Sequence, residues 1–275
     1  MEAGTMFGYM NIFIYNPQAK RARRLKNKII NYLTHLGVKG EIIEIKIKDL
    51  VAKGVSEAIE KGADTIVAIG GDGLINRVIQ SLVNTGINMG FIPTGNTNFM
   101  ANILGIPDWK KGCESLIKKK TIDMNLGLIS GERYFTSSIE VEGKSKEKEG
   151  FFKNLFKKEE KKYHPINMHI EDGNSKFRVQ TDISSILITT VPIPMPEEFD
   201  IEKEIEEQKL NIIIKSKPDK EGRRSKDSIT TLKGQKIEIE SKSGVYIKAD
   251  GEHSGKASVK IEMVKKCLKA IIAEK

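Results

Sequence analysis

The segment Thr65–Val78, TIVAIGGDGLINRV, is the part of the sequence that most limits the fold. Its apolar start, Thr65–Ile69, predicts a buried strand, and the three glycines that surround Asp72 predict a tight turn. Apolar residues then recur at helical spacing from Leu74 to Leu82. A buried strand that turns directly into an amphipathic helix is typical of a βα unit in a parallel sheet.

The same alternation of strand and helix patterns continues through the first 120 residues. It predicts an α/β domain with a parallel, doubly wound sheet. The expected strands are Met10–Tyr15, Ile42–Ile47, Thr65–Ile69 and Met89–Ile92, and the expected helices are Gln18–Leu36, Leu50–Ile59, Leu74–Leu82 and one that ends at Ile117.

The pattern changes near Lys120, where short β segments separated by turn signals such as EDGN and SKSG take over. We therefore expect an α/β domain over residues 1–122 and a β-rich, sandwich-like second domain over residues 123–275. The last segment, VKIEMVKKCLKAIIA, fits either a strand or a helix, and this tail could return to the first domain.

Charge and cysteine content indicate the class of partner and the compartment. The net charge of +9 favours an anionic partner: a nucleotide, a nucleic acid or an acidic membrane surface. Cys113 and Cys267 lack metal-site spacing and fit a reducing cytoplasm. The amino-terminal residues show no signal-peptide pattern, and no uncharged stretch is long enough to span a bilayer.

The glycine corner, Gly70–Gly73, suggests a phosphate site. Backbone N–H groups and the positive end of a helix dipole point out of such a corner, and glycines let a ligand approach closely. Asp72 would repel phosphate unless it held Mg²⁺. The alternative is structural: Asp72 caps the helix, and the glycines only make the turn.

Two further strand ends favour the functional interpretation. The segment GFIPTGNTNFMANILGIP begins at Gly90 and passes a second polar turn, and YNPQAKR follows the first strand at Asn16. The carboxyl ends of parallel strands meet at one edge of a sheet, where such folds bind ligands.

Five motifs in this order resemble the diacylglycerol kinase catalytic-domain family, which includes bacterial lipid kinases and sphingosine kinases. They are NPQA at Asn16, GGDGLINRV at Gly70, PTGNTNFMANILGIP at Pro93, TIDMNLG at Thr121 and GVYIKADGEHSG at Gly244. Together they extend over about 240 residues of the chain.

The resemblance implies transfer of the γ-phosphoryl group of ATP, with Mg²⁺, to a lipid hydroxyl. It implies that Glu252 is the catalytic base with Asp250 in support, and that Asp72 and Asp123 serve the metal. By the same resemblance, the nucleotide-binding positions are Asn16, Gly70, Gly71, Asp72, Gly73, Thr94, Gly95 and Asn98. The alternative for the ADGE segment is a plain β-turn, because Asp-Gly is a common turn dipeptide.

The sequence departs from the family pattern at functional positions. Leu74 stands where the family has Thr, Arg77 where it has Glu, Asn96 where it has Thr and Phe99 where it has Asp. A segment with Glu206-Glu207-Gln208 replaces an Asp-Asp-Gly that is linked to a structural metal in some members. A pseudoenzyme that binds nucleotide or lipid without turnover is therefore an alternative, and NAD kinase, which shares the Gly-Gly-Asp-Gly corner, is another.

Two basic stretches bear on partners. The first, Glu147–Lys162, would place Phe151, Phe152, Leu155 and Phe156 on one helical face among lysines, as in helices that lie on anionic bilayers; a solvated insertion is the alternative. The second, KRARRLKNK from Lys20, is interpreted as a solvated helix face, with Lys20 or Arg21 able to reach phosphates. No nucleic-acid motif is found, and a homodimer is compatible with the sequence.

Overall fold

The computed structural model describes residues 10–47, 50–142, 163–192, 201–218, 227–242 and 244–274. The predicted membrane segment with Phe151, Phe152, Leu155 and Phe156 lies outside the described residues. The chain forms two compact units, one of residues 1–125 and 265–275 and one of residues 126–264.

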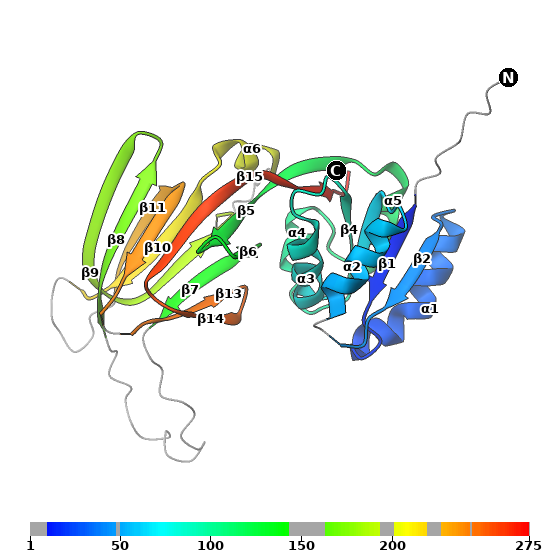
Figure 1. Ribbon diagram of the computed structural model, residues 1–275, viewed down its shortest axis with the longest axis horizontal. Helices are drawn as coiled ribbons and strands as arrows, with labels where there is room; N and C mark the ends of the chain where they lie inside the picture. Colours follow the sequence, from blue (N-terminus) through cyan, green and yellow to red (C-terminus); the bar gives the residue numbers. More distant parts are fainter. Residues whose placement is uncertain are drawn as a thin grey trace, which may run out of the picture. The chain divides into compact units, whose positions relative to one another are not determined.

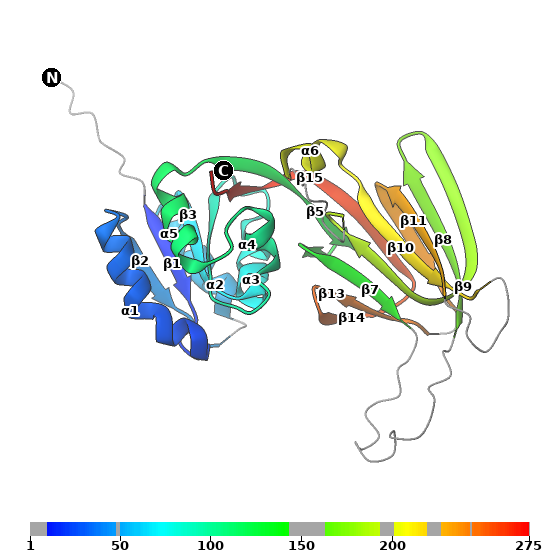
Figure 2. The same ribbon diagram turned by 180° about the vertical axis from the view of Figure 1, so that it is seen from behind.

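The first unit is a parallel α/β sheet with helices on both faces (Figures 1 and 2). Its strands lie in the order β2-β1-β3-β4-β15, and every neighbouring pair is parallel. The strands are β1 (Asn11–Tyr15), β2 (Gly40–Glu44), β3 (Thr65–Gly70), β4 (Asn88–Pro93) and the end of β15 (Val259–Ile271), and the helices are α1 (Lys20–His35), α2 (Val51–Glu60), α3 (Asp72–Leu82), α4 (Phe99–Ile103) and α5 (Trp109–Lys118).

Burial on both sides explains why the central strands are apolar without interruption. Every residue of β1 and β3 is buried, as expected for strands covered on both faces. Side chains of α1 and α5 pack against one face, where Phe13, Ile29 and Leu116 share a core. The predicted doubly wound α/β fold is confirmed.

Two details of the elements complete the expectation. The helix expected to end near Ile117 is α5, which begins after its cap, Asp108, and the second corner opens the separate short helix α4. The side chain of Asp108 accepts hydrogen bonds from the amides of Lys110 (2.8 Å) and Lys111 (3.0 Å), which starts a new helix there. The ambiguous final segment is a strand, β15, whose end pairs with β4.

The second unit is antiparallel and β-rich, as predicted (Figure 1). Its strands follow the order β14-β13-β7-β9-β8-β12-β15, with β10 and β11 attached through β9 and with β6 paired to β5. They are β5 (Thr121–Ile129), β6 (Arg133–Phe135), β7 (Ser138–Glu142), β8 (His164–Asp172), β9 (Ser175–Thr189), β10 (Leu210–Ser216), β11 (Ser228–Gly234), β12 (Lys236–Glu240), β13 (Tyr246–Ala249) and β14 (Glu252–Lys256); α6 (Ile201–Glu207) is its helix.

Isoleucine and valine from alternate positions of these strands form a single core in the second unit. Ile237 and Ile239 of β12 are buried, for example, while Lys236 and Glu240 on the same strand are exposed. Among the described residues, no helix is long and apolar enough to cross a bilayer.

Candidate active site

Three strand-to-helix corners meet at the carboxyl edge of the parallel sheet. They follow β1, β3 and β4, which are direct neighbours in the sheet. The amide of Thr94 donates a hydrogen bond of 2.8 Å to the carbonyl of Gly70, which ties the second and third corners together. The arrangement brings Gly70–Gly73, Thr94, Gly95 and Asn98 to one place, with Asn16 at the end of the adjacent strand.

Gly71 and Gly95 are required because the two corners approach each other closely. A Cβ atom on Gly71 would lie 3.1 Å from the Cα atom of Gly95, and a Cβ atom on Gly95 would lie 2.8 Å from the Cα atom of Gly71. Both contacts are with backbone, which cannot swing away as a side chain can. The glycines therefore bring two backbone segments together at the edge where these folds bind ligands.

Asp72 connects the corners and does not cap its own helix. Helix α3 begins at Asp72, and no side-chain cap bond is formed at its Gly71 N-cap. Instead, Oδ1 of Asp72 accepts a hydrogen bond of 2.7 Å from the amide of Phe99, the first residue of α4. The carboxylate thus holds the starts of two helices together, and both helix dipoles favour its negative charge.

Asn98 and Arg21 shape the third corner. Asn98 is 7% exposed and has left-handed backbone geometry, with φ of 49°. Its Oδ1 accepts from the amide of Gly95 (2.8 Å), and its Nδ2 donates to the carbonyl of Gly95 (3.0 Å). Arg21 of α1 donates to the same carbonyl (2.8 Å) and to Oδ1 of Asn96 (3.3 Å). The loop is therefore fixed before any ligand binds.

Leu74, one of the four residues that depart from the family pattern, has a packing role. A Cβ atom on Gly70 would lie 2.6 Å from Cδ2 of Leu74, so the leucine side chain covers the glycine that ends β3. In the first corner, Oδ1 of Asn16 accepts a hydrogen bond of 2.8 Å from the amide of Gln18. This bond forms a local turn that leads into α1.

The two predicted metal ligands, Asp72 and Asp123, differ in their surroundings. Asp123 lies exposed on β5. Among the described residues, no group of three or more His, Cys, Asp or Glu side chains could hold a metal ion. Asp72 keeps one carboxylate oxygen beyond the bond to Phe99, which suits an ion that is held by one protein carboxylate and by phosphates. In the segment that replaces Asp-Asp-Gly, Glu207 pairs with Lys233, and Gln208 has φ of 55°.

The predicted base, Glu252, follows a two-residue turn in the second unit. Asp250 (φ 49°) and Gly251 (φ 78°) connect β13 to β14, as in a type I′ hairpin turn. The Asp250 carboxylate accepts hydrogen bonds from three successive amides: those of Thr136 (2.9 Å), Ser137 (2.7 Å) and Ser138 (3.1 Å). The ADGE segment therefore does form a β-turn, and the carboxylate of Asp250 holds the segment that leads into β7.

Arg133 contacts the predicted base, Glu252, and no sequence pattern pointed to it. It lies on β6, and its Nη2 atom is 3.1 Å from Oε2 of Glu252. Its other nitrogen, Nη1, donates to Oγ of Ser254 (3.0 Å). The guanidinium fork therefore fixes the orientation of the Glu252 carboxylate. The two residues are 119 positions apart, so no local pattern could have revealed the pair.

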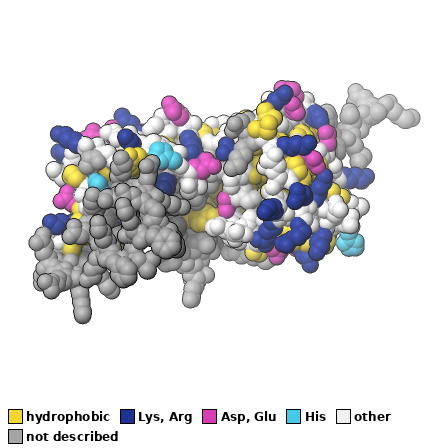
Figure 3. All heavy atoms as spheres, turned by 90° about the horizontal axis from the view of Figure 1, so that it is seen from below, with side chains coloured by type: hydrophobic (Ala, Val, Ile, Leu, Met, Phe, Trp, Pro, Cys, Tyr) yellow, Lys and Arg dark blue, Asp and Glu magenta, His cyan; other side chains and the backbone are white. Residues whose placement is uncertain are grey.

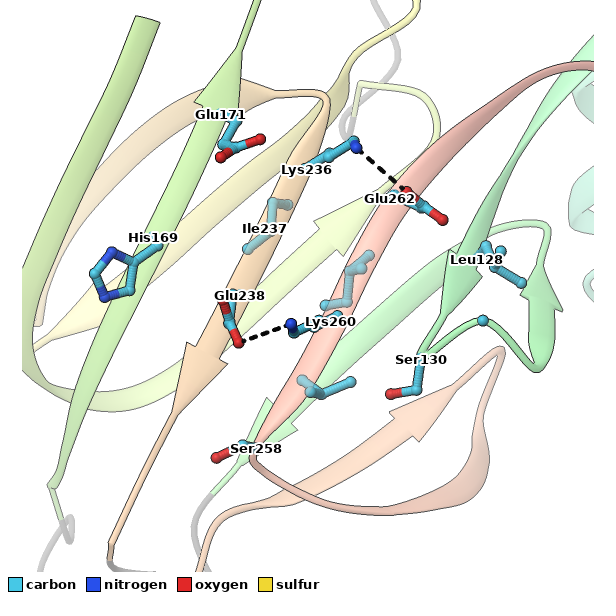
Figure 4. A pocket seen from close by; sticks show the side chains of 13 residues that line it. Leu128, Ser130, His169, Glu171, Lys236, Ile237, Glu238, Ser258, Lys260 and Glu262 are labelled. Carbon is cyan, nitrogen blue, oxygen red and sulfur yellow. Dashed lines mark ion pairs between the residues drawn. The ribbon is translucent and has the colours of Figure 1, made fainter.

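The second unit also contains a cavity of about 670 Å³ over β8, β12 and β15 (Figure 4). None of the predicted site residues lines it. Its lysines are paired across strands: Lys260 with Glu238 (3.5 Å) and Lys236 with Glu262 (3.9 Å). These pairs balance the charge of the cavity wall.

Comparison with known proteins supports the predicted resemblance. The model of the diacylglycerol kinase catalytic domain matches residues 11–129, which include all three corners. The matched region contains β1 to β5 and every predicted nucleotide-binding residue.

Individual relatives agree with this result. The chain is 30% identical over 128 residues to "Diacylglycerol kinase" of Bacillus subtilis, covering 44% of this chain and 42% of that protein. It is 29% identical over 111 residues to "Probable lipid kinase YegS-like" of Enterobacter sp., covering 38% and 37%. These matches therefore extend over less than half of either relative.

Solved structures resemble the chain over a greater length. A crystal structure of a diacylglycerol kinase from Bacillus anthracis superimposes with a TM-score of 0.71 at 15% identity, covering 96% of this chain and 97% of that one. At this identity the likeness shows the fold alone, and it extends over both the first unit and the β-rich unit.

Proposed function

We propose that the protein is a lipid kinase that transfers the γ-phosphoryl group of ATP to a lipid hydroxyl, with Mg²⁺ as cofactor. The observation that carries the proposal is the joined pair of glycine corners, braced by Asp72 and Asn98. Phosphoryl transfer depends mainly on positioning and on neutralising charge, and a rigid corner with outward amides at helix starts supplies both.

The residues have distinct proposed roles. The amides of the glycine corners bind the phosphates, and the close approach of Gly71 and Gly95 leaves no room for side chains there. Bound Mg²⁺ would neutralise phosphate charge, with the outer oxygen of Asp72 as its protein ligand. Glu252, oriented by Arg133, takes the proton of the acceptor hydroxyl.

Phosphate transfer from ATP to dispersed lipid acceptors tests the proposal. We expect turnover in the wild type and a loss of at least about 100-fold in Asp72→Ala and in Glu252→Gln, the range for removal of a positioned group. Glu142→Gln is the matched control for Glu252, because Glu142 is similarly exposed on β7 and pairs with Lys248 at 3.5 Å. That control should retain activity.

The same assay separates the alternatives. If the wild type binds ATP but transfers no phosphate to any lipid acceptor, the protein is a pseudoenzyme. The replacement of Thr by Leu74, which covers Gly70 with an apolar side chain, is the observation in favour of that outcome. Phosphorylation of NAD in place of lipid would assign the protein to the NAD kinases.

A further inference from the structure

The cavity of about 670 Å³ over β8, β12 and β15 has no role in the proposed function. The charged side chains that line it stand on the face of these strands opposite the buried Ile237 and Ile239. Beside β15 lies the tight turn between β5 and β6, where Ser130 and Gly131 have left-handed backbone geometry. The amide of Ser130 donates a hydrogen bond of 2.7 Å to the carbonyl of Lys260. Backbone hydrogen bonds therefore hold both the strands and the turn that surround the cavity.

The wall of the cavity alternates in charge. The pairing register of the three strands places its charged and imidazole side chains in two rows: Glu171–Lys236–Glu262 and His169–Glu238–Lys260. Each carboxylate in these rows has a lysine beside it on the neighbouring strand. The first unit differs, because Figure 3 shows lysine and arginine side chains gathered on its surface. A wall of mixed sign concentrates neither anions nor cations, so the cavity does not select a ligand by net charge.

Two ion pairs between β12 and β15 are too long for good direct hydrogen bonds. Nζ of Lys260 lies 3.5 Å from Oε1 of Glu238, and Nζ of Lys236 lies 3.9 Å from Oε2 of Glu262 (Figure 4). Hydrogen bonds between an ammonium and a carboxylate are about 2.7–2.9 Å long. Each pair therefore presents a donor and an acceptor that one oxygen atom can bridge.

A hydroxyl group is the chemical group that suits such a gap. It accepts a hydrogen bond from the ammonium and donates one to the carboxylate, whereas an added ion would have to displace one partner of the pair. The two pairs lie two residues apart along the same strands, which is about 7 Å. A ligand that bridges both pairs needs hydroxyls about that far apart, and Leu128, which also lines the cavity, can contact its carbon skeleton.

We propose that this cavity is a binding site for a neutral polyol of the sugar class, with one or two rings. Its volume lies within the range of small-molecule sites. Hydrogen bonds to charged groups are stronger than those between neutral groups, so two bridged ion pairs supply the main attraction. The site uses none of the residues proposed to bind ATP, Mg²⁺ or the acceptor hydroxyl.

Heteronuclear NMR of the labelled full chain tests the site, with maltose, D-glucose and myo-inositol as probes and without ATP. In the wild type we expect saturable shifts of the amides of residues 236–240 and 258–262. Lys260→Met breaks one bridge, so the affinity for the tightest-binding probe should fall on the order of ten-fold, as for one hydrogen bond to a charged group. Lys236→Met/Lys260→Met should lower it on the order of 100-fold.

The matched control is Lys248→Met. Lys248 of β13 pairs with Glu142 of β7 across 3.5 Å, the same separation as in the pair of Lys260 and Glu238, but neither residue lines the cavity. This variant should bind the probes as the wild type does. An equal loss of affinity in Lys248→Met and Lys260→Met would overturn the proposal, because position in the cavity would then be irrelevant.

Two zwitterionic probes, glycine betaine and taurine, distinguish hydroxyl bridging from exchange of ion pairs. We expect them to bind more weakly than the sugars, and tighter binding of either one would overturn the assignment to a polyol. The proposal would also be wrong if none of the three polyols gave saturable shifts, or if the shifts lay only outside the cavity. Because these titrations contain no nucleotide and no lipid, their result does not depend on kinase activity.

Discussion

Asp72 has two proposed tasks, and two substitutions separate them. Its Oδ1 accepts the 2.7 Å hydrogen bond from the amide of Phe99, and its other oxygen is the proposed magnesium ligand. Asp72→Asn retains an oxygen that can accept the bond from Phe99 but loses the charge. Asp72→Ala loses both the acceptor and the charge.

The size of the expected effects follows from the geometry. A hydrogen bond to a charged group contributes about 1.5–3 kcal/mol, and the half-buried position of this bond favours the lower end. The carboxylate at the start of α3 adds about 0.5 kcal/mol through the helix dipole. We therefore expect Asp72→Ala to lower the free energy of unfolding by about 2 kcal/mol and Asp72→Asn by about 1 kcal/mol.

Urea unfolding followed by tryptophan fluorescence measures the loss of unfolding free energy in the first unit, where Asp72 lies. The only tryptophan of the chain, Trp109, lies on α5 and packs against the core of the first unit. ATP binding with and without Mg²⁺ measures the second task, and both Asp72 variants should lose the gain in affinity that Mg²⁺ gives. Asp108→Ala is the control: it removes the cap of α5, at a cost of about 1 kcal/mol, and should leave ATP binding intact.

Either of two results would refute this reasoning. If Asp72→Asn retained the full magnesium-dependent affinity, the carboxylate would not hold the metal. If Asp72→Ala unfolded at the same urea concentration as the wild type, the bond to Phe99 would not brace the corners.

Three other predictions follow from contacts at single residues. Gly71→Ala should lower ATP affinity at least ten-fold by calorimetry, because its Cβ would press on backbone, whereas Gly73→Ala, whose Cβ would meet nothing, should not. Asp250→Ala should cost about 2–4 kcal/mol and speed amide exchange at residues 136–138; unchanged exchange there would contradict the anchoring role. Burial raises the pKa of the Cys113 thiol to about 12, so iodoacetamide at pH 8 should modify it only after unfolding. Between about pH 9 and 12 the Cys113 thiol ionises in the unfolded chain but not in the folded one. The raised pKa should therefore also lower the free energy of unfolding as the pH rises through that range.

Local sequence patterns predicted the helices and strands of the first unit and the sheet edge where the site lies. An unbroken apolar run such as β3, followed by glycines, specifies a buried strand and then a turn. The bonds that assemble the site could not be predicted, because they join distant residues. Asp72 bonds to Phe99 across 27 positions, and Arg21 bonds to Gly95 across 74. From sequence alone, Leu74 indicated only a lost hydroxyl; its contact with Gly70 depends on how α3 leaves the sheet.

The position of β15 affects how this protein can be divided for experiments. Its final residues pair with β4 at Asn88 and Met89, and its Leu268 and Ile271 are buried, yet they follow the family match by well over 100 residues. A fragment cut at residue 129 would expose the edge of β4 and lose these core side chains. The homologous region is therefore shorter than the smallest piece expected to fold, and an expressible first unit would require residues 265–275 to be joined back by a linker.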